Sequence, residues 1–240
     1  MPFGTEIVFP PTELRHSLEY WELPPDTPLN RQLEEFDYDS TQDLIFKNYA
    51  KLAKKWSEGI RGCESLRYVE IRGQCKQPLL DGIATCPNIS HLWVDQGREL
   101  DYKVLKTLKL LKIAYLRGTL NSEFSHQCLF DPVVVHLHFS NLPVNLTDLD
   151  ENHWQRVKCI SFMGSGDYSK ITIRGIENLS KLKSLENITF AGVRRDTPHR
   201  LDMLQDLPNL KAVNIFGLKK SWSVEDGKRL LEKGVLVNDV

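Results

Sequence analysis

This chain has little of what marks a membrane protein, a disulfide-rich secreted protein or a nucleic-acid-binding protein. No apolar run approaches the length of about 20 residues that a transmembrane helix needs. The net charge is only −1, which gives no general attraction to nucleic acid or to membranes. The five cysteines are odd in number and include no Cys-x-x-Cys pair, which favours free thiols in a reducing compartment. The start of the chain lacks the features of a secretory signal, so we expect a cytoplasmic protein.

What the sequence does have is one apolar pattern that returns seven times. The pattern is apolar-x-x-apolar-x-apolar, and its successive starts lie 22 to 28 residues apart. The last two apolar positions alternate with one other residue, as in a strand with one buried face. Two residues after the pattern, six of the seven copies have Gly or Asn, which tolerates positive φ and predicts a sharp turn. The second copy has Gln96 there, and its glycine, Gly97, follows one residue later. The seven segments are Leu66-Val69-Ile71, Ile89-Leu92-Val94, Leu111-Ala114-Leu116, Val134-Leu137-Phe139, Val157-Ile160-Phe162, Leu185-Ile188-Phe190 and Leu210-Val213-Ile215.

Several predicted strands are followed by an apolar segment with helical spacing. Leucines or isoleucines three to four residues apart, as at Leu79, Leu80 and Ile83, predict a short α or 3₁₀ helix on the return path. Equivalent segments occur at residues 104–108, 176–182 and 201–207. A single unit cannot bury both of its faces, but stacked units form a continuous core.

The period and the pattern resemble the leucine-rich repeat superfamily, in particular irregular cytosolic bacterial members. The resemblance covers about residues 64–217 and implies an α/β solenoid of about seven irregular repeats with a parallel concave sheet. The strand-terminal asparagine of regular members is present only as Asn141, so we expect uneven curvature.

Both ends of such a stack need caps, because the terminal units otherwise expose their core. We expect an N-terminal cap over residues 1–63, consisting of an extended segment and a helix over 41–57. Lysines on that helix leave a membrane-docking role open as an alternative. A C-terminal cap over 218–240 is expected to contain a helix followed by a short strand. The caps and the repeats together are expected to form one structural domain.

Residues between the buried strand positions point away from the core and form the predicted binding surface. Because adjacent strands lie about 4.8 Å apart, Trp93 and Tyr115 are expected to form an aromatic ridge. Arg72, Asp95 and Arg117 flank this ridge, and aromatic residues and Arg are the residues that anchor protein interfaces. An alternative is that residues 1–39 fold over this face. The predicted partner-binding residues are Tyr68, Glu70, Arg72, His91, Trp93, Asp95, Tyr115, Arg117, His136 and His138.

In the fourth repeat, the pattern places His138 level with Tyr115 and His136 level with Ile113. Insertions at residues 163–174 and 193–200 are further candidates for the interface, because insertions in repeat proteins map to loops on one face, often the binding face. The second insertion carries Arg194 and Arg195, which leaves RNA or an acidic protein open as its partner.

These features predict a non-enzymatic module that binds a protein partner and uses no metal or cofactor. The family resemblance implies more. Small bacterial members without a signal peptide are often immunity proteins, so the chain is expected to be a monomer that pairs with a toxin domain and occludes its active site.

The alternative of the same general kind is an adaptor or scaffold protein that recognises other proteins. An enzyme would need Cys159 and His136 or His138 to form a thiol–imidazole pair, yet no residue that orients the base is evident. A metal site on these histidines and His91 would need three ligands to converge on one ion, which strand spacing disfavours.

Overall fold

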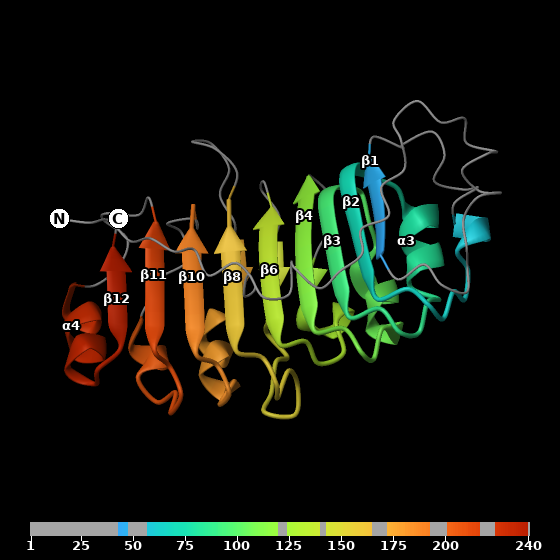
Figure 1. The fold of residues 1–240 in the computed structure, drawn as a ribbon. Helices are drawn as coiled ribbons and strands as arrows, with labels where there is room; N and C mark the ends of the chain where they lie inside the picture. Colours follow the sequence, from blue (N-terminus) through green and yellow to red (C-terminus); the bar gives the residue numbers. More distant parts are fainter. Residues whose placement is uncertain are drawn as a thin grey trace.

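Parallel strands laid side by side in chain order organise the structure (Figure 1). The computed structural model describes residues 43–47, 57–119, 124–139, 143–164, 172–192, 201–216 and 224–239. Nine strands within these residues form one parallel sheet, so the expected mixed α/β fold with a parallel sheet is confirmed. The strands are β1 (Asp43–Lys47), β2 (Tyr68–Cys75), β3 (His91–Arg98), β4 (Ile113–Thr119), β6 (Val134–Phe139), β8 (Cys159–Met163), β10 (Asn187–Ala191), β11 (Ala212–Phe216) and β12 (Leu236–Asp239).

A row of backbone hydrogen bonds joins the starts of successive strands. The residue before each strand donates its N–H to the carbonyl of the equivalent residue before the preceding strand. Six such bonds, each 2.7 or 2.8 Å long, link Arg67, Ser90, Lys112, Val133, Lys158, Glu186 and Lys211. We call this row the start ladder, and it fixes the register of β2 to β11.

The return segments are short helices that pack beside one another on one side of the sheet (Figure 1). Those expected near residues 79–83, 104–108, 176–182 and 201–207 are confirmed. The helices are α3 (Gln77–Ile83), α4 (Val224–Glu232) and the 3₁₀ segments η2 (Tyr102–Thr107), η3 (His126–Cys128), η4 (Ile176–Lys181) and η5 (Leu201–Leu204). The expected helix and strand at the C-terminal end are also present, as α4 and β12.

Two Pro-Asn dipeptides in the return segments have the same structural role. The side-chain amide of Asn88 donates to the carbonyl of Glu64, and that of Asn209 donates to the carbonyl of Lys183, both at 2.8 Å. Each asparagine thereby satisfies a backbone acceptor one unit earlier in the chain, which holds neighbouring units together.

The core lies between the sheet and the return segments. The strand positions predicted to face inward are buried, except Phe139, whose side chain lies outside the described residues. The rings of Phe162 and Phe190 stack in this core with centroids 5.6 Å apart. A second, three-stranded parallel sheet, which the sequence pattern did not predict, adds Phe124, Val144 and Ile173 to this core. Its strands are β5 (Phe124–Ser125), β7 (Pro143–Asn145) and β9 (Thr172–Arg174).

The N-terminal helix expected over 41–57 is wrong over Asp43–Lys47. These residues form β1, which pairs with β2 and places Leu44 in the core. A segment with alternating and helix-compatible apolar positions adopts the strand here because the edge of β2 offers it backbone partners. Residues 1–42 and 48–56, residues 165–171 of the first insertion and all of the second insertion lie outside the described residues.

The register predicted for the fourth repeat is wrong by two residues. Val135 and Leu137 are the inward residues of β6 and pair with Ala114 and Leu116 of β4. Pro132, which is buried, therefore takes the place that the pattern gave to Val134. A two-residue shift keeps the same side chains on the same face, so alternation alone does not distinguish the two registers.

We predict that Gly175 and Gly227 respond oppositely to replacement by alanine. Gly175 has φ of +71°, and an added Cβ would lie 2.5 Å from the backbone N of Thr147. Gly175→Ala should therefore lower the free energy of unfolding by about 2–4 kcal/mol. Gly227→Ala in α4, where an added Cβ meets no described atom within 4 Å, should raise it by about 0.5–1 kcal/mol. Urea unfolding followed by circular dichroism measures both, and equal stabilities would contradict the close approach at Gly175.

Candidate protein-binding face

The outward side chains of β2, β3 and β4 carry an aromatic pair at their centre. Trp93 and Tyr115 are register partners on neighbouring strands, and their rings stack with centroids 3.7 Å apart and planes 13° apart. Both side chains are half-buried. The aromatic ridge predicted from the sequence is therefore present as a stacked pair.

Further rings extend this aromatic cluster across the sheet. His136 lies beside Tyr115 on β6, with ring centroids 6.2 Å apart, and Tyr68 and His91 are separated by the same distance. His136, not His138, is thus level with the aromatic pair, as the corrected register of β6 requires. His138 pairs in register with Arg117 and Met163.

Two ion pairs lie beside the aromatic pair and hold their charged groups in place. Arg72 donates from Nε to Glu70 at 2.7 Å, and Tyr68 donates its hydroxyl to the same carboxylate at 2.8 Å. On the next two strands, Arg117 donates to Asp95 at 3.1 Å. Eight of the ten predicted binding residues are therefore brought together on β2, β3 and β4 (all but the two histidines of β6).

The strands that carry this face are longer than their successors and irregular at their ends. β2 and β3 each have one extra residue relative to the next strand, after Ile71 and after Val94. Such bulges bend a strand and re-aim its side chains, and they are frequent next to functional sites. The turns predicted at Gly73 and Gly118 are wrong, because both glycines lie inside strands. Gly192, with φ of +64°, does end its strand as predicted.

The C-terminal half of the same face differs in chemistry. The row that contains Trp93, Tyr115 and His136 continues on the next strands. Its further register partners are Ser161, Thr189, Asn214 and Asn238. Asn238 donates to Asn214 at 2.7 Å, and Asn214 donates to Thr189 at 3.3 Å. These amides satisfy one another across the strands, so this half offers neither aromatic rings nor charges in that row.

Burial keeps His91 and His136 neutral near pH 7. It lowers the pKa of His136 to about 4, and it lowers the pKa of His91, as does the positive charge of Lys112 nearby. Burial also raises the pKa of the Tyr115 hydroxyl. The charges in this region therefore come from the two ion pairs and not from the histidines.

The strand register sets neither His136 nor His138 opposite Cys159, the thiol considered for a thiol–imidazole pair. Cys159 pairs in register with Val134 and Asn187, whereas His136 pairs with Ser161. Burial raises the pKa of the Cys159 thiol, which lowers the fraction of reactive thiolate. All five cysteines are free, as predicted, and four are buried. Within the part of the chain that the structure describes, no three His, Cys, Asp or Glu residues are arranged to hold a metal ion.

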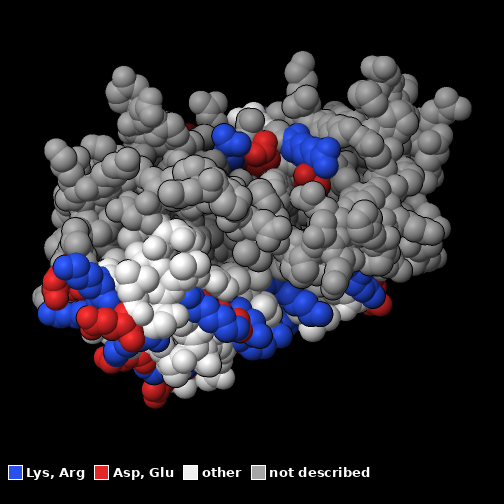
Figure 2. Space-filling view, turned by 60° about the vertical axis from the view of Figure 1, so that its left-hand side comes forward, with Lys and Arg blue, Asp and Glu red and all other residues white. Residues whose placement is uncertain are grey.

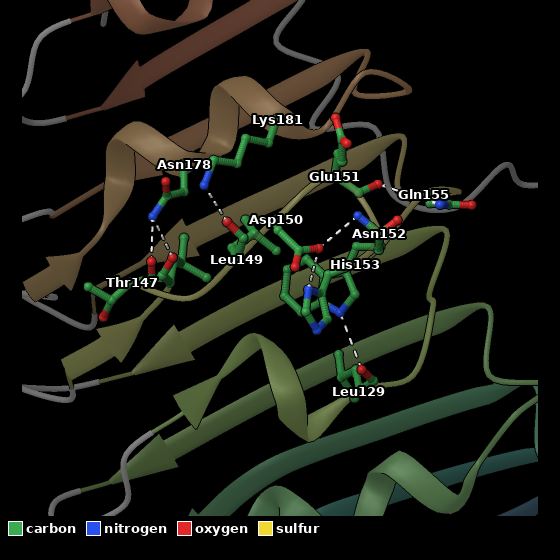
Figure 3. Close-up of polar contacts among 12 residues, drawn as sticks. Leu129, Thr147, Leu149, Asp150, Glu151, Asn152, His153, Gln155, Asn178 and Lys181 are labelled. Carbon is green, nitrogen blue, oxygen red and sulfur yellow. Dashed lines mark hydrogen bonds and ion pairs between the residues drawn. The ribbon is translucent and has the colours of Figure 1, made fainter.

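A second polar cluster, on the side of the return segments, was missed from the sequence (Figure 3). Asn178 and Lys181 of η4 donate to the carbonyls of Thr147 and Leu149, at 2.8 and 3.0 Å. The indole of Trp154 donates to the carbonyl of Leu129 at 3.4 Å. These donors are directed at backbone acceptors of neighbouring segments, so the cluster stabilises the fold.

Two histidines lie in contact beside this cluster, His126 on η3 and His153 between β7 and β8. His153 contacts Asp150 at 2.9 Å, and its ring meets that of buried His126 edge-on at 4.5 Å. Burial, together with the neighbouring His153, lowers the pKa of His126. The Asp-x-x-His spacing of Asp150 and His153 was the one sequence signal for this contact.

Comparison with known proteins does not assign the chain to a family. A scan against models of protein families finds no match, and a search of curated proteins finds no similar sequence. Among the described helices, none is long and apolar enough to cross a membrane.

We predict that the aromatic pair stabilises the fold beyond the area that each ring buries. In a double-mutant cycle with Trp93→Ala and Tyr115→Ala, the coupling energy should be about 0.5–1.5 kcal/mol, as for other stacked pairs. Urea unfolding of the four proteins measures this energy. A coupling within error of zero would contradict direct ring contact.

We also predict that His136 makes the fold sensitive to acid. Its folded-state pKa lies below the unfolded value, so its contribution is complete above about pH 6.5 and is lost as the pH falls toward 4. Between pH 7.5 and pH 5, this one group should cost about 2 kcal/mol of unfolding free energy. Between these two pH values, the unfolding free energy of the His136→Gln variant should therefore fall by about 2 kcal/mol less than that of the parent protein. Equal losses would place the sensitivity elsewhere.

Proposed function

We propose that this protein is a non-enzymatic binding protein of the leucine-rich repeat type, and that it holds another protein on the outward face of β2, β3 and β4. The architecture is supported by the chain-ordered parallel sheet, the period of its strands and the helical return segments on one side. The observation that carries the binding function is the stacked Trp93–Tyr115 pair with one ion pair beside it on β2 and a second further along β3 and β4.

Two physical features support protein binding over catalysis. Aromatic side chains and arginines are enriched among the residues that dominate binding energy at protein interfaces. The strands hold these side chains in place before a partner arrives, which reduces the entropy lost on association. His91 and His136 are neutral near pH 7, and the raised pKa of the Cys159 thiol means that this thiol is not an activated nucleophile.

Our proposal extends to the physiological role. The resemblance to irregular bacterial leucine-rich repeat proteins supports an immunity protein that pairs with one toxin domain and blocks its active site. Such a protein should have a single partner bound with nanomolar affinity, because neutralisation requires near-complete occupancy. Several weaker partners would instead indicate an adaptor or scaffold protein.

The first test locates the interface by photo-crosslinking. A photoreactive amino acid at His91, on the outward face, should crosslink to one protein in a lysate of the source cells. The same group at Phe130, which is 52% exposed on a return segment, should not crosslink to that protein. Co-expression with the crosslinked protein should relieve any growth inhibition that it causes. Crosslinking from Phe130 alone would contradict the proposed face.

We predict that Trp93→Ala and Tyr115→Ala together weaken binding of this partner at least about a hundredfold, because both residues are expected to be hot spots. The matched control is Leu110→Ala with Phe130→Ala, which removes two exposed apolar side chains outside the outward face and should leave the affinity within about twofold. Calorimetry measures both, and unfolding curves verify that the variants fold. Unchanged affinity in a folded Trp93/Tyr115 variant would exclude the aromatic pair as the anchor.

A further inference from the structure

In both ion pairs of the binding face, the side chain of the arginine is more exposed than that of its acidic partner. The side chain of Arg72 is 51% exposed and that of Glu70 only 11%, whereas Arg117 is 41% exposed and Asp95 29%. The charges of each pair cancel, but the arginine is the more accessible member, so a partner contacts the positive group more readily than the negative one. The face therefore presents more positive charge than the count of its residues indicates.

The carboxylates also orient the guanidiniums. Glu70 contacts Arg72 through both of its oxygens, at 2.7 and 3.3 Å, and Asp95 contacts Arg117 through one. A guanidinium has five N–H donors in a planar fork whose geometry matches a second carboxylate. Each Arg is thus held in place while a large part of its side chain stays accessible.

The aromatic pair, like the two arginines, presents positive charge on the outward face. Trp93 and Tyr115 stand on neighbouring strands and stack face to face, so the ring planes stand upright on the sheet and their outer edges point away from it. The edge of an aromatic ring carries partial positive charge and its face partial negative charge. Ring edges favour oxygen acceptors, and the faces turned toward each other are not available to a ligand.

We infer that the outward face of β2, β3 and β4 binds an acidic protein surface, whose carboxylates pair with Arg72 and Arg117, both of which lie two residues further along their strands than the row of Trp93 and Tyr115. Arg72 and Arg117 lie on strands two apart, so the matching carboxylates are spaced roughly 10 Å from each other. The inference rests on the proposed binding function and names the chemistry of the partner.

A nucleic acid fits this face less well. Single strands stack their bases on exposed aromatic faces and follow a continuous positive groove. Here two ring faces are already occupied by each other, and a carboxylate accompanies each Arg. Figure 2 likewise shows Lys and Arg interspersed with Asp and Glu among the described residues in view.

The test measures binding of fluorescently labelled poly-L-glutamate to the full chain at low ionic strength, with labelled oligothymidylate as the second probe. Arg72→Gln with Arg117→Gln removes the two guanidiniums. Lys103→Gln with Lys106→Gln, on η2, makes the same change in net charge on exposed residues outside the strands. Arg72→Lys with Arg117→Lys keeps the charge and removes the fork.

We expect the Arg→Gln pair to weaken poly-L-glutamate binding roughly tenfold, because both charge-assisted contacts to carboxylates are lost. The Lys→Gln pair should weaken it less than about twofold. The Arg→Lys pair should lose severalfold, and it carries the test if the Arg→Gln pair fails to fold.

No binding of poly-L-glutamate to the parent protein, or equal losses in the Arg→Gln and Lys→Gln pairs, would overturn the inference. Tighter, arginine-dependent binding of oligothymidylate would overturn it in favour of nucleic acid. If the group at His91 still crosslinks to a protein in either case, the binding function stands and only the acidic chemistry of the partner is wrong. If nothing crosslinks from His91, the binding function itself fails.

Discussion

The start ladder is the constraint on which the rest of this structure depends. Its six short backbone bonds set where each strand begins relative to the one before it, from Arg67 to Lys211. A slip of one residue would turn every core side chain of a strand outward, and a slip of two would keep the core but separate outward neighbours. The stack of Trp93 on Tyr115 is a direct consequence of this register.

The two halves of the sheet differ in strand length and in outward side chains. Strands β2 and β3 are eight residues long and bulged and carry rings and ion pairs, whereas β8, β10 and β11 are five residues long and have Ser161, Thr189 and Asn214 in their central outward row. Thr189, Asn214 and Asn238 of β12 are joined by hydrogen bonds, so binding there would have to break existing bonds. In the first half, the bonds within each ion pair leave much of the Arg side chains accessible. This asymmetry is the reason for proposing an interface on β2, β3 and β4.

Much of this arrangement was predictable because the core repeats. Alternating apolar residues located all seven strands, and their spacing put Trp93 beside Tyr115. The departure of Gln96 and Gly97 from the pattern was a visible trace of the bulge in β3. The position of His136 was not predictable, because Val135-Leu137 and Leu137-Phe139 satisfy the same alternation. Strand β1 and the small sheet of β5, β7 and β9 depend on partners distant in sequence, and segments of two to five residues carry too little pattern to reveal them.

The two ion pairs explain how a nearly neutral protein can still prefer a charged partner. Electrostatic selection depends on which charges are exposed at the contact, and the total charge of −1 does not report this. Partial burial of Glu70 and Asp95 keeps each Arg in a fixed position, at the cost of part of its attraction for a partner. A partner carboxylate that joins such a pair meets a guanidinium that is already oriented, so less side-chain entropy is lost on binding. This arrangement favours selectivity for the right spacing of carboxylates over general attraction to any acidic surface.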